Sequence, residues 1–450
     1  MRDTGCEIRD AGYRIRSLVW VVLLLLFPGT SFSQNPVTLK EAIATGLKNN
    51  YSILLQINEA EIAANNNTLG NAGFLPSLTL NASQNNNFSN THQETSAGTV
   101  KDINNAIANS FNAGVALNWT LFDGLSMFVN KKMLGILEDL GENGTRLVME
   151  GTVSDITMTY YAIIQREKMV SVLQEAVDLS LQRKRIAEAK LSIGAGSQLM
   201  LLQSTVDLHA DSTRLIQQQA LLANTRVDLN RLLGLEVTSL VMITDSIVLT
   251  DPGSYDTLLK KALAANTVLI EARLQQGLMR QEVKSAQSDR YPSLFLSAGY
   301  NANQLNSQTG YLQFSQSYGP SIGVSLSYNL FNGFDVNRAI KNTKVLVSSS
   351  DLEFEDSEQE VRASLLKTRT DYTANKEIIG MQQVNVQVAA QNVEVAFEKY
   401  KLGSLNDIEL REIQKKLIDA QYELILSTYE AKKAETELLR LSGLLLSRLK

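Results

Sequence analysis

Cysteine, histidine and proline are all scarce in this 450-residue chain. It contains one cysteine, Cys6, two histidines, His92 and His209, and six prolines. So few thiols and imidazoles predict neither a metal site nor histidine-based acid–base catalysis, and no cofactor is expected. The prolines leave residues 77–251 and 321–450 free of helix breakers, so both stretches can hold very long helices.

Basic runs and catalytic groupings are absent as well. The formal net charge is -5, and no block of lysine or arginine could follow a phosphate backbone, so nucleic acid is not an expected partner. No nucleophile and base form a recognisable set. The glycine pair Gly194 and Gly196 does not follow a strand, as a nucleotide-binding loop would. The sequence therefore does not predict an enzyme.

The amino terminus is typical of a secretory signal. Arg14 and Arg16 stand just before the short apolar run Ser17–Phe27, and Ser31–Ser33 has the small-x-small form of a cleavage site. The run is shorter than the roughly 20 residues that cross a bilayer, so a cleaved signal over 1–33 is favoured over an uncleaved anchor. Removal of Cys6 with the signal leaves no cysteine for disulfides. No other stretch is apolar enough for a transmembrane helix, so only strands could place the mature chain in a membrane.

The remaining chain contains one pattern twice. Trp-Thr-Leu-Phe-Asp-Gly ends at Gly124, and Tyr-Asn-Leu-Phe-Asn-Gly ends at Gly333, 209 positions later. Three further pairs repeat with the same or a similar interval: Gly194 and Gly403, Gly234 and Gly443, Pro76 and Pro292. This period is far longer than the roughly 20–50 residues of a solenoid unit. The sequence therefore predicts two structural repeats, 34–240 and 241–450.

Each repeat contains two segments in which apolar residues alternate with Gly, Ser, Asn and Thr. They predict β-hairpins over about 77–122 and 293–331, with strands of about nine or ten residues and a polar loop over about 84–110. Such alternation also fits a soluble sheet with one face on a core. Four aromatic residues at one end of the strands favour a membrane interface instead: Trp119, Phe122, Tyr328 and Phe331. Because four strands cannot close a membrane barrel, three copies would have to share one barrel of twelve strands.

A long helical pattern follows each hairpin. The two patterns cover about 126–191 and 336–402, on the order of 100 Å each at 1.5 Å per residue. Apolar residues recur at threes, fours and sevens, as in a coiled coil. Tight glycine turns then lead into returning helices over about 198–233 and 407–441.

Three smaller features complete the predicted layout. The segment 38–71 is predicted to form one helix before the first hairpin. Glycines at positions 141, 144 and 151 mark a point where the first long helix is predicted to bend or break. The segment 237–250 joins the two repeats and is predicted to form a small collar outside the helices.

Together these features resemble the TolC-like outer-membrane efflux proteins over essentially the whole mature chain. The resemblance depends on the duplicated layout, the Pro-Ser-Leu strand starts, the Leu-Phe-Asp-Gly and Leu-Phe-Asn-Gly junctions and the glycine turns. It implies a mainly α-helical fold with a membrane β-barrel, in which each repeat runs helix, β-hairpin, long helix, turn, helix. A homotrimer would form a twelve-stranded barrel in outer-membrane lipid and a twelve-helix tunnel into the periplasm.

The resemblance also implies a function, that of a passive exit duct in a tripartite efflux or type I secretion system. The helix tips would close the channel and dock onto a periplasmic adaptor protein, which connects to an inner-membrane pump of the RND or ABC type. The family's docking turns look like Ile193-Gly194-Ala195 and Leu402-Gly403-Ser404, and both depart from the family pattern in the third residue. Tyr400 looks like the tip tyrosine that holds the closed state, whereas Leu405 stands where a gating arginine is often found.

An acidic pair after the second turn extends the resemblance. Related channels place two acidic residues three apart at this point, and the matching positions look like Glu409 and Glu412. Spacing of three puts both on one helix face, so three copies would bring six carboxylates to one ring that attracts cations. The first repeat has Met200 and Gln203 at the equivalent places, so only one helix pair is acidic. The alternative is an ordinary solvated pair on a helix surface.

Other functions stay open at this level. An exported structural or adhesive coiled-coil protein would have similar helices but no pore. A periplasmic adaptor also has long helical hairpins, but it should carry an additional β-rich domain of the biotin-carrier type, and no such stretch is apparent. His209 has no partner histidine or cysteine and is interpreted as a packing or surface residue.

Overall fold

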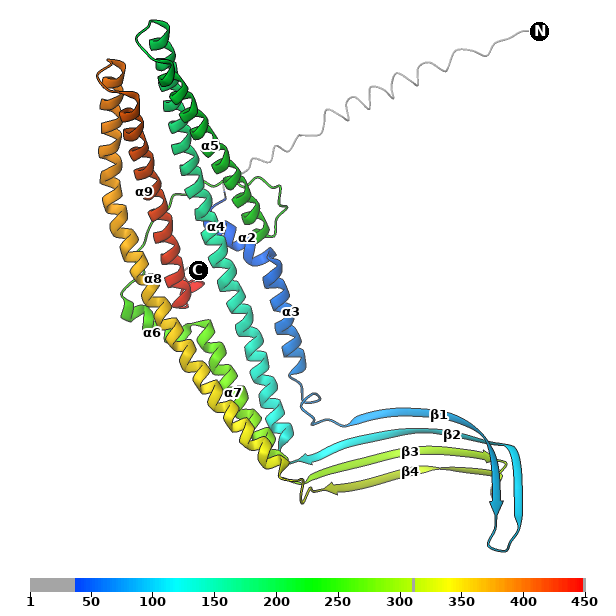
Figure 1. The fold of residues 1–450 in the computed structure, drawn as a ribbon. Helices are drawn as coiled ribbons and strands as arrows, with labels where there is room; N and C mark the ends of the chain where they lie inside the picture. The colour runs from blue at the N-terminus through cyan, green and yellow to red at the C-terminus, as the bar shows by residue number, and fades with distance from the viewer. Residues whose placement is uncertain (1–36, 310–311, 448–450) are drawn as a thin grey trace, which may run out of the picture.

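The computed structural model describes residues 37–309 and 312–447. The predicted signal segment 1–33, with Cys6, lies outside the described residues. Figure 1 shows long helices running side by side, with a four-stranded sheet at one end and two helix turns at the other. The expectation of a mainly helical chain that contributes four strands is confirmed.

The elements occur in the same order in both halves of the chain. The first half contains α2 (Leu39–Asn49), α3 (Tyr51–Asn66), β1 (Ser77–Glu94), β2 (Val100–Asp123), α4 (Ser126–Ser192) and α5 (Gln198–Leu233). The second contains α6 (Tyr255–Ala265), α7 (Thr267–Ser288), β3 (Ser293–Ser307), β4 (Phe314–Ser327), α8 (Asp335–Lys401) and α9 (Asp407–Leu441). The long helices and the returning helices therefore begin and end within one residue of their predicted positions.

The strands are longer than predicted, and the loop of the first hairpin is much shorter. β1 and β2 pair as far as Glu94 and Val100, so most of the predicted loop over 84–110 is strand. Polar residues predominate on both faces of this outer part, with few apolar side chains such as Phe88 and Ile107, so no sustained apolar alternation reveals it. At the other end β4 stops at Ser327, and the segment with Tyr328 and Phe331 continues without strand structure.

The strand register places most apolar side chains of the four strands on one face, with Phe295 and Leu305 of β3 on the other. Directly opposed residues of an antiparallel sheet point to the same side, and Leu80, Val115, Tyr300 and Pro320 form one such row. The opposite face is made of small or uncharged residues; one row across it is Asn81, Gly114, Asn301 and Gly319. No charged residue belongs to that face between 79–89, 106–120, 295–307 and 315–327. The sheet therefore has one apolar and one uncharged polar side.

The predicted single helix over 38–71 is wrong, because Asn50 divides it. The Asn50 side chain caps α3 by accepting from the Ser52 N–H at 2.9 Å, and its amide donates to the Leu232 carbonyl at 2.8 Å. Asn266 does the same between α6 and α7, and it donates to the Leu441 carbonyl at 2.8 Å. Each asparagine thus starts one helix and ties it to the end of a returning helix.

The first long helix is continuous, so the predicted bend at its glycines does not occur. α4 runs through all three positions, and at Gly141 a Cβ atom would lie 3.1 Å from the Cα of Ala60 on α3. The glycine therefore permits close packing of two helices and does not interrupt one. Among the described residues, no helix is both long enough and apolar enough to cross a membrane.

The segment between the repeats is held across the middle of the helices. Tyr160 on α4 donates its hydroxyl to Asp245 at 2.6 Å, and Tyr372 on α8 donates to the Thr250 carbonyl at 3.0 Å. Glu435 on α9 accepts from the Thr250 N–H at 3.0 Å. Burial first, and then the bond to Asp245, raise the pKa of Tyr160, so its hydroxyl keeps its proton and remains a donor. These contacts fix the segment to three helices at once.

Candidate functional site

The two tip turns have the same backbone design. Gly194 and Gly403 take left-handed conformations, with φ of 72° and 79°, and each ends a long helix. The next helix is capped in each case: the Ser197 hydroxyl accepts from the Met200 N–H at 3.2 Å, and the Asn406 side chain accepts from the Glu409 N–H at 2.8 Å. The local sequence alone is enough to specify these turns.

A buried arginine joins the two helical hairpins about three turns behind the tips. Arg183 on α4 is fully buried, and it donates to both carboxylate oxygens of Asp407 on α9, at 3.1 and 2.8 Å. The same guanidinium donates to Asp207 on α5 at 3.0 Å. Asp407 is in the first turn of α9, where a negative charge is also favoured by the helix dipole. One side chain therefore links three helices.

A second arginine also joins the two helical hairpins, this time from the α8–α9 hairpin to the α4–α5 hairpin. Arg411 on α9 donates to both oxygens of Asp211 on α5, at 2.7 and 2.8 Å, and the Ser180 hydroxyl donates to Asp211 at 2.6 Å. Burial alone would lower the pKa of Arg411, but the hydrogen bond and charge of Asp211 more than offset it and the pKa is raised. The guanidinium therefore stays charged. We call Arg183, Arg411, Asp207, Asp211 and Asp407 the tip charge cluster.

Tyr400 is fixed where the two helical hairpins meet. Its side chain is fully buried, and the Lys190 ammonium of α4 lies 4.3 Å from its ring centre while donating to its backbone carbonyl at 2.8 Å. Burial, followed by the nearby Asp407 carboxylate, raises the pKa of Tyr400 to about 12. The hydroxyl is therefore neutral at any physiological pH.

An apolar cluster lies beside these polar contacts. Its buried members are Ala396, Tyr400 and Leu410, and side chains from both hairpins pack against them, among them Ile186, Met200 and Leu405. Leu405, at the position where an arginine was expected from the resemblance, thus contributes apolar packing. The arginines that connect the two hairpins are instead at positions 183 and 411.

The two predicted entrance glutamates are placed differently from the tip charge cluster. Glu409 and Glu412 are both exposed on α9, whereas Asp407 and Leu410 on the same helix are buried. They lie one turn apart and share a face that points away from the protein interior. In one copy of the chain they are therefore free to face an aqueous space.

The tip turns themselves are open to solvent. Ile193 and Leu402 are 77% and 83% exposed, and Gly194, Ala195, Gly403 and Ser404 are exposed as well. Both apolar side chains lie at the end of the molecule, in turns whose other residues are exposed too. Their exposure fits a surface that another protein covers.

The four predicted interface aromatics gather where the sheet meets the helices. Trp119 and Phe122 are on β2, and the Trp119 indole N–H donates to the Phe74 carbonyl at 2.9 Å. Tyr328 and Phe331 follow the end of β4 and are exposed. All four therefore lie at the helix-side end of the sheet, although two of them are not on strands.

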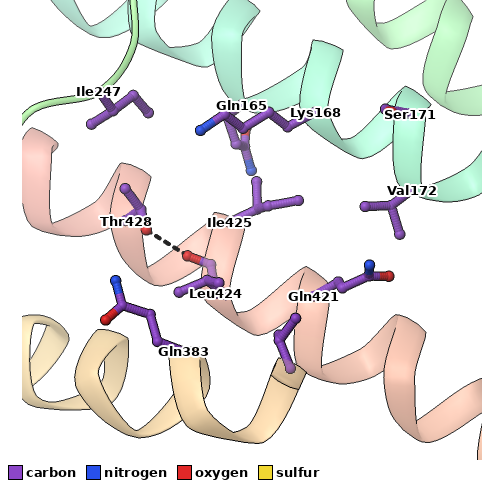
Figure 2. Close-up of a pocket in the computed structure, with 11 residues that line it drawn as sticks. Gln165, Lys168, Ser171, Val172, Ile247, Gln383, Gln421, Leu424, Ile425 and Thr428 are labelled. Atoms are coloured by element: carbon purple, nitrogen blue, oxygen red, sulfur yellow. Dashed lines mark hydrogen bonds between the residues drawn. The ribbon is translucent and has the colours of Figure 1, made fainter. Parts of the chain in front are cut away.

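A groove in the helical wall lies between the tips and the middle of the molecule. Figure 2 shows it over α9, between α4 and α8, with Ile247 of the connecting segment at its edge. Its volume is about 510 Å³, and neutral side chains such as Gln165, Gln383 and Gln421 line it, with Lys168 as the charged member. None of the predicted site residues lines this groove. It is a gap between two helical hairpins and is separate from the tip site.

Sequence reasoning missed the tip charge cluster, although one signal was available. The buried seam of α4 includes Met169, Val172, Ala176, Ser180 and Arg183, at intervals of three and four. An arginine in such a seam must have buried anionic partners, because an unpaired buried charge is too costly to keep. The partners themselves, 224 and 24 positions away, could not be read from local sequence.

Comparison with known proteins places this arrangement among outer-membrane channels. Residues 258–444 match the family model described as outer membrane efflux protein. The outer membrane protein TolC of Salmonella enteritidis is 21% identical over 344 residues, which cover 73% of this chain and 68% of the relative.

Two solved structures extend the comparison to the fold. The CmeC outer membrane channel of Campylobacter jejuni aligns with a TM-score of 0.76 at 14% identity, over 99% of this chain and 93% of its own. The outer membrane protein VceC of Vibrio cholerae aligns with a TM-score of 0.71 at 16% identity, over 90% and 96%. At this level of identity the likeness establishes a shared fold.

Proposed function

Because the chain belongs to the TolC-like outer-membrane efflux proteins, we propose that it works as the passive exit duct of a tripartite efflux or type I secretion system. It lies in the outer membrane and extends into the periplasm. The single observation that carries the proposal is the sheet, which has one apolar side and one uncharged polar side. Such a sheet can face lipid with one side and water with the other.

The channel is proposed to be a homotrimer. The sheet of one copy has the strand order β1-β2-β3-β4, so β1 and β4 each leave one edge without a partner among the residues that the structure describes. Backbone groups at such edges cannot remain unpaired in lipid. Pairing of β1 with β4 of the next copy would close a barrel of twelve strands, and the long helices would continue it as a tunnel.

The gate is proposed to lie at the helix tips. In one copy the tip charge cluster and the Lys190–Tyr400 contact hold hairpin α4–α5 against hairpin α8–α9. Opening requires the two hairpins to separate, and the free energy for this comes from contacts with a partner at the tips. The exposed turns around Gly194 and Gly403 are the proposed docking points for a periplasmic adaptor, which an inner-membrane pump of the RND or ABC type would energise.

Glu409 and Glu412 are proposed to form the entrance ring of the assembled channel. Both are exposed on one face of α9, so three copies would bring six carboxylates together at the tunnel end. A ring of this charge attracts cations and repels anions. The aromatic side chains Trp119, Phe122, Tyr328 and Phe331 are proposed to mark the membrane interface nearest the periplasm.

Reconstitution into a planar bilayer tests the proposal directly. Protein extracted in detergent should migrate as a trimer and produce discrete conductance steps after insertion. A structural or adhesive protein without a pore would give no conductance, and an adaptor would be recovered without a detergent-stable trimer. A monomer that stays in plain buffer would contradict the proposed function.

A further inference from the structure

We propose that residues 90–105, the outermost part of the first hairpin, form a lid ribbon that folds over the outer mouth of the channel; this rests on the proposed trimeric function. β2 pairs with β3 only as far as Ala108, opposite Ser307, whereas β1 and β2 continue together to Glu94 and Val100. The lid ribbon therefore extends beyond the rest of the sheet as two strands alone. Figure 1 shows that it turns sharply away from the line of the sheet.

The bend at the base of the lid ribbon is built by specific contacts. The register shifts between Ser89 and Thr91, and Asn105 takes a left-handed conformation with φ of 54°. The Asn105 N–H donates to the Asn90 side-chain oxygen at 2.8 Å, which satisfies a group that the bulge removes from the ladder. Asparagine tolerates this conformation better than other side chains except glycine. The turn is therefore a defined bulge with its own hydrogen bond.

A second set of contacts fixes the hinge to the neighbouring hairpin. Gln308, just beyond β3, donates its N–H to the Ile107 carbonyl at 3.0 Å, and its side-chain oxygen accepts from the Ile107 N–H at 3.0 Å. With these two hydrogen bonds, Gln308 extends the antiparallel pairing of β2 with β3 by one residue beyond the end of β3. It anchors β2 directly below the bend, so the ribbon can move only beyond Ile107.

The direction of the bend follows from burial. Ala106, opposite Ser89 on the uncharged polar face, is 1% exposed although it lies near the end of the sheet. Thr91, Gln93 and Ile103 on the ribbon are half-buried and lie on the same face, where Lys101, opposite Gln93, is exposed; His92 and Asp102 on the other face are both exposed. The concave side of the bend is therefore the polar face, which is the face that a barrel turns toward its lumen.

The ribbon is long enough to reach the channel axis. Twelve strands spaced about 4.8 Å apart and tilted by about 40° close into a barrel with a backbone radius of about 12 Å. Five extended residues beyond the hinge span about 16 Å before the turn is counted. Three such ribbons, one from each copy, would meet above the lumen. They would cover the mouth against solutes from outside while cargo moving outward pushes them apart.

Cysteine cross-linking tests whether the ribbons meet. The only cysteine of the chain is Cys6, in the predicted signal, so introduced cysteines are unique reporters in the mature protein. Ala97→Cys, in the turn of the ribbon, should form disulfide-linked dimers within conducting trimers under mild oxidation. Ser83→Cys, on the lumen face within the barrel wall, is the matched control and should not cross-link, because the walls are too far apart. Conducting trimers of Ala97→Cys that do not cross-link would overturn the lid.

Shortening the ribbon provides an independent measurement. Replacement of residues 90–105 by an Asn-Gly turn should raise single-channel conductance by roughly twofold, because the mouth would no longer be covered. Gln308→Ala, which frees the hinge but keeps the ribbon, should give rapid conductance flicker between the two levels. Unchanged conductance in the shortened trimer would also exclude the lid. If the unaltered chain conducts nothing, the proposed channel function itself is wrong, so the two failures are distinguishable.

Discussion

The guanidinium of Arg183 and the carboxylate of Asp407 meet through two parallel hydrogen bonds across 224 positions of sequence. Both groups are buried, and each belongs to a different helical hairpin. A buried pair of this kind adds little net stability compared with apolar packing, but the loss of one member is strongly destabilising. The pair therefore acts mainly as a specific latch between the hairpins.

Removal of the Arg183 charge should open the tips. Arg183→Met would leave the buried Asp407 and the half-buried Asp207 without their main cation, at a cost of about 3–5 kcal/mol. Much of this cost can be relieved if the hairpins separate and water reaches the carboxylates. We therefore expect a larger and more frequent open conductance in planar bilayers, together with a lower thermal midpoint.

Arg185→Met is the matched control for this change. Arg185 is exposed on the same helix, two positions further on. Its loss should alter neither conductance nor thermal stability, since isolated surface charges contribute little. If both variants behave like the unaltered protein, the latch role of Arg183 is wrong.

The pair Arg411 and Asp211 should show strong coupling. In a double-mutant cycle with Arg411→Met and Asp211→Leu, we expect the loss in the double variant to be smaller than the sum of the single losses by about 1–3 kcal/mol. The raised pKa of Arg411 means that its charged form contributes stability at every pH below its usual value, and this is lost only in strong alkali. Arg411 itself should therefore add no pH dependence between pH 6 and pH 9. Additive losses would show that the two groups act independently.

The local elements of this fold could be predicted, whereas contacts between them could not. Helix ends at Gly194 and Gly403 depend on residues a few positions apart, so their predicted bounds are accurate. The division at Asn50 was missed because the apolar pattern continues on both sides of it, and the residue that fixes it is the distant Leu232 carbonyl. The outer half of the first hairpin was missed because polar residues predominate on both of its faces, so the apolar alternation that predicts a strand is not sustained.

The candidate site divides in the same way. The exposed turns and the glutamate pair follow from short motifs in the sequence. The tip charge cluster depends on which helices become neighbours, and α4 lies beside α9 only after the whole chain has folded. Leu405 stands where the resemblance implies that an arginine is often found, and it packs in the apolar cluster; the arginines that join the two hairpins are Arg183 on α4 and Arg411 on α9.

Neutralising the entrance glutamates should reduce ion selectivity. Glu409→Gln combined with Glu412→Gln removes six charges from a trimer, so we expect the cation-to-anion permeability ratio to fall by roughly threefold or more. Block by divalent cations should weaken as well. Reversal potentials in a salt gradient measure the first effect.

Glu394→Gln provides the comparison, because Glu394 is an exposed glutamate on α8 near the same end. Its removal should leave the permeability ratio unchanged. Equal effects of the two changes would mean that overall surface charge, and not a ring at the entrance, determines selectivity.

Asn50 should be far more important for stability than a simple helix cap. Asn50→Ala removes both the cap of α3 and the donor to the buried Leu232 carbonyl, so we expect a loss of about 2–4 kcal/mol. Asn406→Ala, at an exposed cap with no such second bond, should cost only about 1 kcal/mol. Thermal unfolding of the two variants in the same detergent compares them, and similar losses would refute the proposed role of the Leu232 bond.

The polar side of the sheet carries no fixed charge over residues 79–89, 106–120, 295–307 and 315–327. In electrical terms, this section is a neutral resistor in series with the carboxylate ring proposed at the tips. Its length and width set how much current flows, but it does not distinguish the sign of the ion. A reversal potential therefore reads the charged groups outside this section, whereas total conductance depends on the section as well.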